Sequence, residues 1–204
     1  MRTWLLCGIA LMLVFASPVM AATWAEDGDA GDLPATAQVP VGQGALDAIT
    51  GTLPAGDADM YCISIVDDTL VDIQTCTGTS FDTQLFLFRA DGIGVGMNDD
   101  ACSLQSDITP ATMTCPAAVG PGEYLIAVSK YNKDPVDNAG GLLWLSGTAE
   151  HCADGPAAAN PIAGWTGTTT TGGAYQITFR SVNFCGGAVP VERTSWGTIK
   201  SLYR

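Results

Sequence analysis

The residues best suited to chemistry in this sequence are acidic, and they gather in short segments that contain glycine. Asp57-Ala58-Asp59 precedes one apolar segment and Asp82 precedes the next. Two further groups follow, Asp91-Gly92-Ile93-Gly94 and Asn98-Asp99-Asp100. Closely spaced short carboxylates can direct several oxygens at one point, and calcium takes roughly 6–8 oxygen ligands in flexible geometry. We expect the 57–59 and 91–100 segments to converge at one end of the folded domain and bind calcium.

A second interpretation of the same acids stays open. Asp and Asn side chains hydrogen-bond their own backbone and so close turns, which would place these residues at strand ends without a metal. The spacing also lacks the DxDxDG start and the later Glu of an EF-hand loop. A calcium dependence of stability would separate the two interpretations.

Two aromatic side chains near the Thr/Gly-rich loop 167–173 could stack on sugar rings, Trp165 and Tyr175. By contrast, we expect Trp144, within the apolar LLWLS segment, to lie in the core. Trp24 is expected to pack the N-terminal segment onto the domain.

Catalytic chemistry has little support in the sequence. The chain has one His, His151, next to Cys152 and without a GxSxG-like nucleophile turn, so a surface position is expected for it. Paired carboxylates could hydrolyse glycosides, but these acids sit in glycine turns, whereas a general acid needs an apolar pocket. A single His and no CxxC also argue against zinc. No catalytic residue is predicted.

Composition excludes some partners. Of 204 residues, 21 are acidic and 8 basic, for a formal net charge of −13. Nucleic-acid binding needs a basic face and is therefore not expected.

The N-terminus has the pattern of a secretory signal peptide. Arg2 is followed by the apolar run Leu5–Phe15, too short to span a bilayer, and then by Val19-Met20-Ala21. We predict a signal peptide over 1–21, cleaved after Ala21 or Ala22, and no membrane span in the mature chain.

Export changes the meaning of the cysteines. The leader holds Cys7, and six remain, which predicts three disulfides in an oxidising compartment. The six are Cys62, Cys76, Cys102, Cys115, Cys152 and Cys185. Closure of local loops favours the pairs 102–115 and 152–185, which leaves 62–76.

The body of the chain reads as short strands separated by turn residues. Alternation in segment 58–66 indicates a half-buried strand, and the uniformly apolar segments 84–88 and 124–128 indicate strands covered on both faces. The predicted strands are 45–53, 58–66, 69–77, 83–89, 122–130, 141–147 and 174–182. This pattern predicts an all-β fold, an antiparallel β-sandwich of jelly-roll type, over 22–188. Residues 189–204 form a basic tail with a short helix or no regular structure.

Four motifs, in order, resemble the bacterial pre-peptidase C-terminal (PPC) domain family and its secreted stand-alone relatives. They are DxDxY at Asp57–Tyr61, DTxLxLF at Asp82–Phe88, DGxGxxxNDD at Asp91–Asp100 and PGxYxxAxS at Pro121–Ser129. The resemblance covers roughly 24–182. It implies a β-sandwich at the cell surface or outside the cell, with a non-catalytic accessory role.

Some members of that family bind calcium in this acidic region. By motif match, the resemblance implies ligands at Asp57, Asp59, Asp91, Asn98, Asp99 and Asp100. One departure is Arg89, where relatives often carry Asp; a cation there weakens the calcium interpretation or forms an internal ion pair.

The function expected from the sequence is a secreted, calcium-stabilised module with a binding or structural role and an extracellular protein or glycan as partner. A carbohydrate-binding module is the alternative, and a secreted hydrolase is the least favoured class.

Overall fold

The structure, a computed structural model, describes residues 22–186. The predicted signal peptide over 1–21 and the predicted tail over 189–204 lie outside these residues. Strands dominate residues 22–186, which contain no α-helix and one 3-10 turn, η1 (Thr112–Thr114). No helix in this part of the chain is long and apolar enough to cross a membrane.

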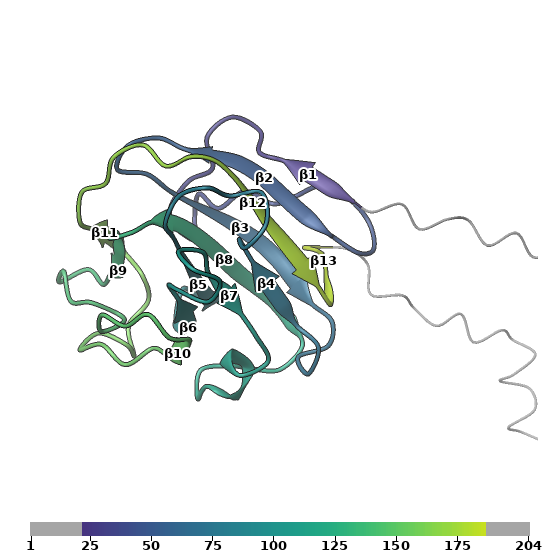
Figure 1. Ribbon diagram of the computed structural model, residues 1–204. Coiled ribbons are helices and arrows are strands. Elements are labelled where there is room, and N and C mark those ends of the chain that lie inside the picture. The colour runs from purple at the N-terminus through teal and green to yellow at the C-terminus, as the bar shows by residue number, and fades with distance from the viewer. Residues whose placement is uncertain (1–21, 187–204) are drawn as a thin grey trace, which may run out of the picture.

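Two large sheets stack face to face, which confirms the predicted all-β antiparallel sandwich (Figure 1). One has six strands in the order β10 (His151–Cys152), β6 (Gly94–Asn98), β5 (Thr83–Arg89), β8 (Gly122–Lys130), β3 (Ala58–Ile65) and β13 (Val182–Phe184). The other has five, in the order β1 (Thr23–Ala25), β2 (Ala48–Leu53), β12 (Gly173–Arg180), β4 (Asp72–Gln74) and β7 (Asp107–Ile108). All their pairings are antiparallel except β1 with β2. A small sheet of β9 (Asp134–Val136) and β11 (Gly164–Thr166) lies at the end of the molecule opposite β13 (Figure 1).

The main core lies between the two large sheets. Alternate residues of β3 and β8, such as Ile63 and Ile126, are fully buried there against Ile49 and Ile177 of the five-stranded sheet. Because side chains alternate across a strand, this burial of alternate residues accounts for the period-2 pattern over 61–65, whereas Met60, on the opposite face of β3, is buried as well.

A second apolar core covers the outer face of the six-stranded sheet. Phe86 and Phe88 of β5 pack there beneath Trp144, with ring centroids 5.3 and 5.4 Å from the indole. Leu85 and Leu87 of the same strand point into the main core. Strand β5 is therefore covered on both faces, as its uniformly apolar sequence predicts, and Trp144 is a core residue, 3% exposed.

The prediction of a strand over 141–147 is wrong. Only Leu142 in this segment forms an isolated β-bridge, with Val136. The apolar residues of the segment, Leu143 and Trp144, instead cap the second core from a loop. Apolar composition alone does not distinguish a strand from a loop that covers a sheet.

Strand β6 is absent from the strands predicted from the sequence, and the structure shows it fully buried. Its glycines have a packing reason. A Cβ on Gly94 would lie 2.6 Å from Trp144 Cη2, and one on Gly96 would lie 2.7 Å from Thr112 Cγ2. Only glycine lets these two side chains lie directly on the strand.

All six cysteines within residues 22–186 form disulfides, as predicted, but each predicted pair is wrong. The pairs are Cys62–Cys185, Cys76–Cys102 and Cys115–Cys152, with Cα–Cα distances of 5.5, 5.8 and 5.4 Å. Strand β13 pairs with β3 so that Phe184 opposes Ile63, and one further step brings Cys185 opposite Cys62. Strand register across the fold, rather than loop closure between neighbours in sequence, selects the partners.

Candidate metal sites

The predicted acidic residues lie largely at one end of the six-stranded sheet, but they form two clusters there. Asp59 of β3, Val128 of β8, Leu85 of β5 and Asn98 of β6 occupy one row across the sheet. Asp59 and Asn98 are thus three strand spacings apart, about 14 Å. A single ion cannot bridge that distance, so the predicted single cluster is divided in two.

The first group, which we call the Asp59 cluster, consists of Glu26, Asp29, Asp57 and Asp59. One carboxylate oxygen each of Glu26, Asp29 and Asp59 lies within 4.8 Å of the other two. The pKa of Asp57 is raised by burial first and then by Asp29 and Glu26. These side chains come from two distant segments, the N-terminal one and the start of β3.

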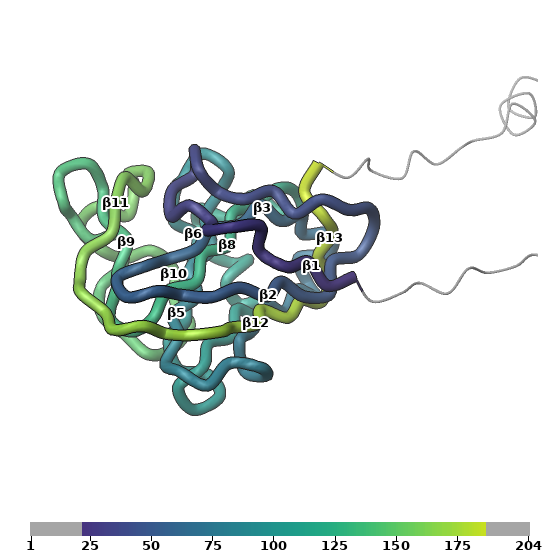
Figure 2. Tube along the Cα trace, turned by 90° about the horizontal axis from the view of Figure 1, so that it is seen from above, coloured from purple at the N-terminus to yellow at the C-terminus, as the bar shows by residue number. Residues whose placement is uncertain are grey.

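Backbone hydrogen bonds hold the N-terminal segment in this place. Strand β1 pairs with β2, and Glu26 accepts hydrogen bonds from Ala30 N (2.9 Å) and Thr52 N (3.0 Å). Met60 N donates to Gly31 O at 3.1 Å. Trp24 packs edge-on against Tyr61 at 5.9 Å, as predicted for it. Figure 2 shows this segment passing over β3.

Asp59 is the most unusual carboxylate of the cluster. It is 0% exposed, and its Oδ2 accepts a 2.6 Å hydrogen bond from the hydroxyl of Tyr175, which also contacts the Tyr61 hydroxyl. Its Oδ1 is buried and has no hydrogen-bond partner among residues 22–186. Burial above all, together with Glu26, Asp57 and Asp29, raises the pKa of Asp59 to about 8. A cation would supply the missing partner and remove the cost of ionisation.

The second group, which we call the Asp99 cluster, consists of Asp82, Asp99 and Asp100. One oxygen of each lies within 4.8 Å of the other two. The Oδ1 atoms of all three are buried without a hydrogen-bond partner in the described part of the chain. Burial first, then Asp100, Asp82 and Asp134, raises the pKa of Asp99 to about 7.

The backbone around the Asp99 cluster is well fixed. Asp99 N and Asp100 N both donate to Thr148 O, at 3.3 and 3.0 Å, and Ser106 Oγ donates to Asp99 O at 2.9 Å. The carboxylates are therefore held together by main-chain bonds while their own oxygens stay free. Asp82, Asp99 and Asp100 could together hold a hard cation, which prefers oxygen ligands.

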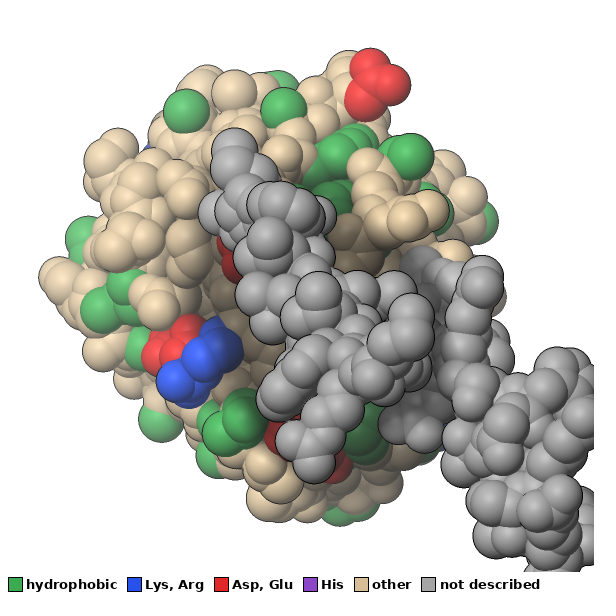
Figure 3. Space-filling view, turned by 90° about the vertical axis from the view of Figure 1, so that its right-hand side faces the viewer, with side chains coloured by type: hydrophobic (Ala, Val, Ile, Leu, Met, Phe, Trp, Pro, Cys, Tyr) green, Lys and Arg blue, Asp and Glu red, His purple; other side chains and the backbone are tan. Residues whose placement is uncertain are grey.

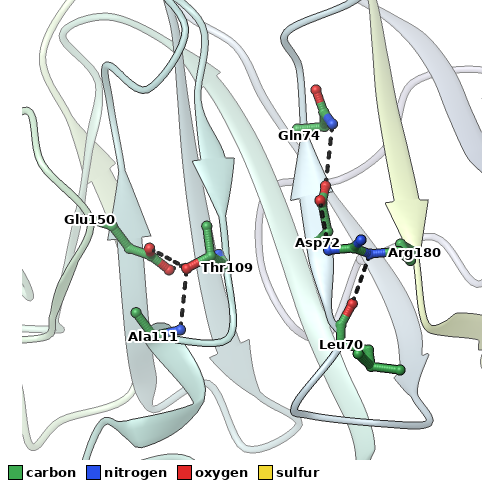
Figure 4. A network of polar contacts seen from close by, with 7 residues as sticks. All are labelled: Leu70, Asp72, Gln74, Thr109, Ala111, Glu150 and Arg180. Atoms are coloured by element: carbon green, nitrogen blue, oxygen red, sulfur yellow. Dashed lines mark hydrogen bonds and ion pairs between the residues drawn. The ribbon is translucent and has the colours of Figure 1, made fainter.

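Other acids of the chain show what a satisfied carboxylate looks like. Glu150 accepts four hydrogen bonds from the backbone and hydroxyls of Thr109 and Thr112, between 2.6 and 3.2 Å. Asp72 lies 3.2 Å from the Arg180 guanidinium and accepts a bond from Gln74 (Figure 4). On the face shown in Figure 3, the most prominent basic patch lies directly beside an acidic one. None of the ion pairs within 22–186 involves either cluster.

Two of the predicted ligands lie outside both clusters. Asp91 lies in the β5–β6 turn, at the other end of these strands, and its carboxylate is 2.6 Å from the Arg89 guanidinium. Arg89 therefore forms the internal ion pair that the sequence left open. The Asn98 side chain bonds the backbone, accepting from Asp107 N and donating to Thr148 O.

The two side chains predicted to stack on sugar rings, Trp165 and Tyr175, do not form a pair of exposed rings. Tyr175 is 2% exposed and bonded to Asp59, so its ring offers no face to a ligand. Trp165 is half-buried, packs edge-on against Phe86 at 5.5 Å and donates to Asp32 O. His151 lies in the short strand β10, which pairs with β6, and its partly exposed ring has Nδ1 2.7 Å from Ala149 O.

Sequence reasoning did not include Glu26, Asp29 and Asp82 among the ligands. The signal was present: the EDGDAGD run at 26–32 also combines closely spaced acids with glycine, and Asp82 directly precedes a strand. The chain matches no protein-family model, and no curated protein matches it.

Proposed function

We propose that this chain is an exported, non-catalytic β-sandwich module in which calcium at the Asp59 cluster fastens the N-terminal segment to the sandwich. The observation that carries this proposal is Asp59 itself, a wholly buried carboxylate with an unpartnered oxygen beside Glu26 and Asp29. Such a group is costly to bury unless something binds it.

Export is supported by the leader-like sequence at 1–21 and by the three disulfides, which persist in oxidising compartments. Calcium is the cation that suits such a location, since extracellular modules bind it at about 10⁻⁴–10⁻³ M. The resemblance to PPC domains points the same way. A binding or structural role is favoured over hydrolysis because the one His has its Nδ1 against the Ala149 carbonyl and its Nε2 3.7 Å from Asp154, with neither nitrogen against a hydroxyl.

The test is a calcium titration of the mature protein followed by thermal unfolding and by hydrogen exchange of residues 22–38. Calcium at about 100 times Kd should stabilise the native state by roughly 2.7 kcal/mol and slow exchange in this segment. Asp59→Asn should abolish the local protection. Asp68→Asn, in the turn between β3 and β4, is the matched control and should keep it. If hydrogen exchange of residues 22–38 is the same in calcium and in EGTA, the proposal is wrong and the acids of the Asp59 cluster only close turns.

A further inference from the structure

The Asp99 cluster opens onto a pocket that the Asp59 cluster does not share. The pocket has a volume of about 270 Å³, and its walls include Asp99, Asp134, Tyr131, Trp144, Leu145 and Thr148. Asp99 belongs to both the cluster and the pocket. The bonds from Asp99 N and Asp100 N to Thr148 O tie the 145–148 wall to the acids.

The charge of the pocket walls favours a cationic ligand. It has two carboxylates in its walls and no Lys or Arg. Asp99 is 4% exposed, and its Oδ1, like those of Asp82 and Asp100, is buried without a hydrogen-bond partner within 22–186. Oxygens packed this closely leave room for a single-atom cation between them, whereas an organic ammonium brings carbon substituents that do not fit there.

A cation held by three Asp side chains has coordination positions left over. Calcium takes roughly 6–8 oxygens, more than three carboxylates supply in most binding modes. With one oxygen from each Asp, about three to five positions stay open. The pocket, at about 270 Å³, is larger than the waters that could fill them, each of which needs about 30 Å³. The space beside Asp99 therefore suits a ligand with neutral oxygens of its own.

The rest of the pocket suits such a ligand too. Tyr131 and Leu145 are 50% and 52% exposed, and Tyr131 thus presents a free ring at the pocket wall. Asn132 and Ser146 add polar side chains to the lining, and Trp144 Nε1 is buried without an acceptor in the described residues. Aromatic surface combined with a few polar groups is the usual composition of a small-molecule site.

We propose that calcium bound by Asp82, Asp99 and Asp100 recruits a carbohydrate to this pocket, with two neighbouring sugar hydroxyls on the ion and the sugar ring against Tyr131. This inference rests on the proposed binding role and names its ligand class. The proposed sugar site therefore lies beside the Asp99 cluster and not at Tyr175 and Trp165, the residues expected from the sequence.

The test is calorimetric titration of the full mature protein with a panel of methyl glycosides, in calcium and in EGTA, backed by an immobilised glycan array. At least one glycoside should bind in calcium and none in EGTA. Tyr131→Ala should keep calcium binding but weaken the glycoside roughly tenfold, the loss expected for one aromatic contact. Asp99→Asn should abolish glycoside binding, and Asp68→Asn should leave it unchanged.

Several outcomes would overturn the inference. Glycoside binding that persists in EGTA removes the ion from recognition. Binding of n-butylammonium in EGTA would assign the pocket to organic cations, and no binding on either the panel or the array would leave it without a sugar ligand. Asp59→Asn separates the two proposals, since it should remove protection of residues 22–38 while glycoside binding survives.

Discussion

At the scale of single residues, the distinctive feature is a buried acid–phenol chain. Inside the sandwich, the Tyr175 hydroxyl lies between Asp59 Oδ2 and the Tyr61 hydroxyl and contacts both. All three residues are at most 2% exposed. Burial and the neighbouring charge raise the pKa of both tyrosines, so they remain protonated donors. These side-chain contacts join β3 of one sheet to β12 of the other.

We predict that Tyr175→Phe destabilises the protein by about 1–3 kcal/mol, because it leaves a buried oxygen of Asp59 without its donor. Denaturant unfolding in EGTA measures the change. Tyr131→Phe is the control: that residue is half exposed, and its loss of a hydroxyl should cost less than about 0.5 kcal/mol. If the two variants lose equal stability, the buried hydrogen bond from Tyr175 to Asp59 does not stabilise the protein as predicted.

A second prediction concerns Asp107, which belongs to neither cluster. Burial first, then Asp72 and Glu150, raises the pKa of Asp107 from 3.8 to about 6, and its Oδ1 is buried without a partner among residues 22–186. Because the folded pKa is the higher one, the folded state binds more protons between pH 4 and 6, and stability falls as pH rises through that window.

Asp107→Asn should therefore raise the melting temperature at pH 7.5 and leave it nearly unchanged at pH 3.5, where the carboxyl is mostly protonated in both states. Thermal unfolding at the two pH values measures this. A variant that is less stable than the parent at pH 7.5 would show that the ionised carboxylate has a partner in solution.

At the scale of elements, strand β6 depends on its glycines. A Cβ at Gly94 would overlap the Trp144 ring, and overpacking of this kind typically costs about 1–3 kcal/mol. We predict a loss in this range for Gly94→Ala, measured by denaturant unfolding. Gly164→Ala is the matched control, since its Cβ would meet only Val136 Cγ2 at 3.8 Å. If the two variants lose the same free energy of unfolding, the Trp144 ring does not pack directly on β6 at Gly94.

At the scale of the whole molecule, the disulfides join segments far apart in sequence. Cys62–Cys185 spans 123 residues and Cys76–Cys102 spans 26. In the chain-entropy account, such loops correspond to about 5 and about 3.5 kcal/mol of stabilisation. Replacing both cysteines of the 62–185 pair by Ser should therefore lower the free energy of unfolding more than the same change at the 76–102 pair.

The same pairing is open to a direct measurement. Non-reduced peptide mapping should recover the three pairs 62–185, 76–102 and 115–152, with no free thiol in the unfolded, unreduced protein. Recovery of 102–115 or 152–185 would contradict the strand register described for β3 and β13.

The sequence by itself determined the class of fold and the positions of several strands. Alternation in 58–66 and uniform apolarity in 84–88 and 124–128 report how many faces of each strand are buried, and that property is local. For the same reason the strand ends at Asp57, Asp82 and Asp99 could be recognised as acidic, and an even count of mature cysteines indicated three disulfides.

Only the tertiary structure decided which of these residues meet. Strand order placed three spacings between Asp59 and Asn98 and so divided one expected site into two. It also brought Glu26 to Asp59, buried Tyr175 and matched Cys62 with Cys185. The physical reason is that contact between distant segments depends on sheet order and register, which arise from packing of the whole chain, whereas burial of a strand is recorded in its own residues.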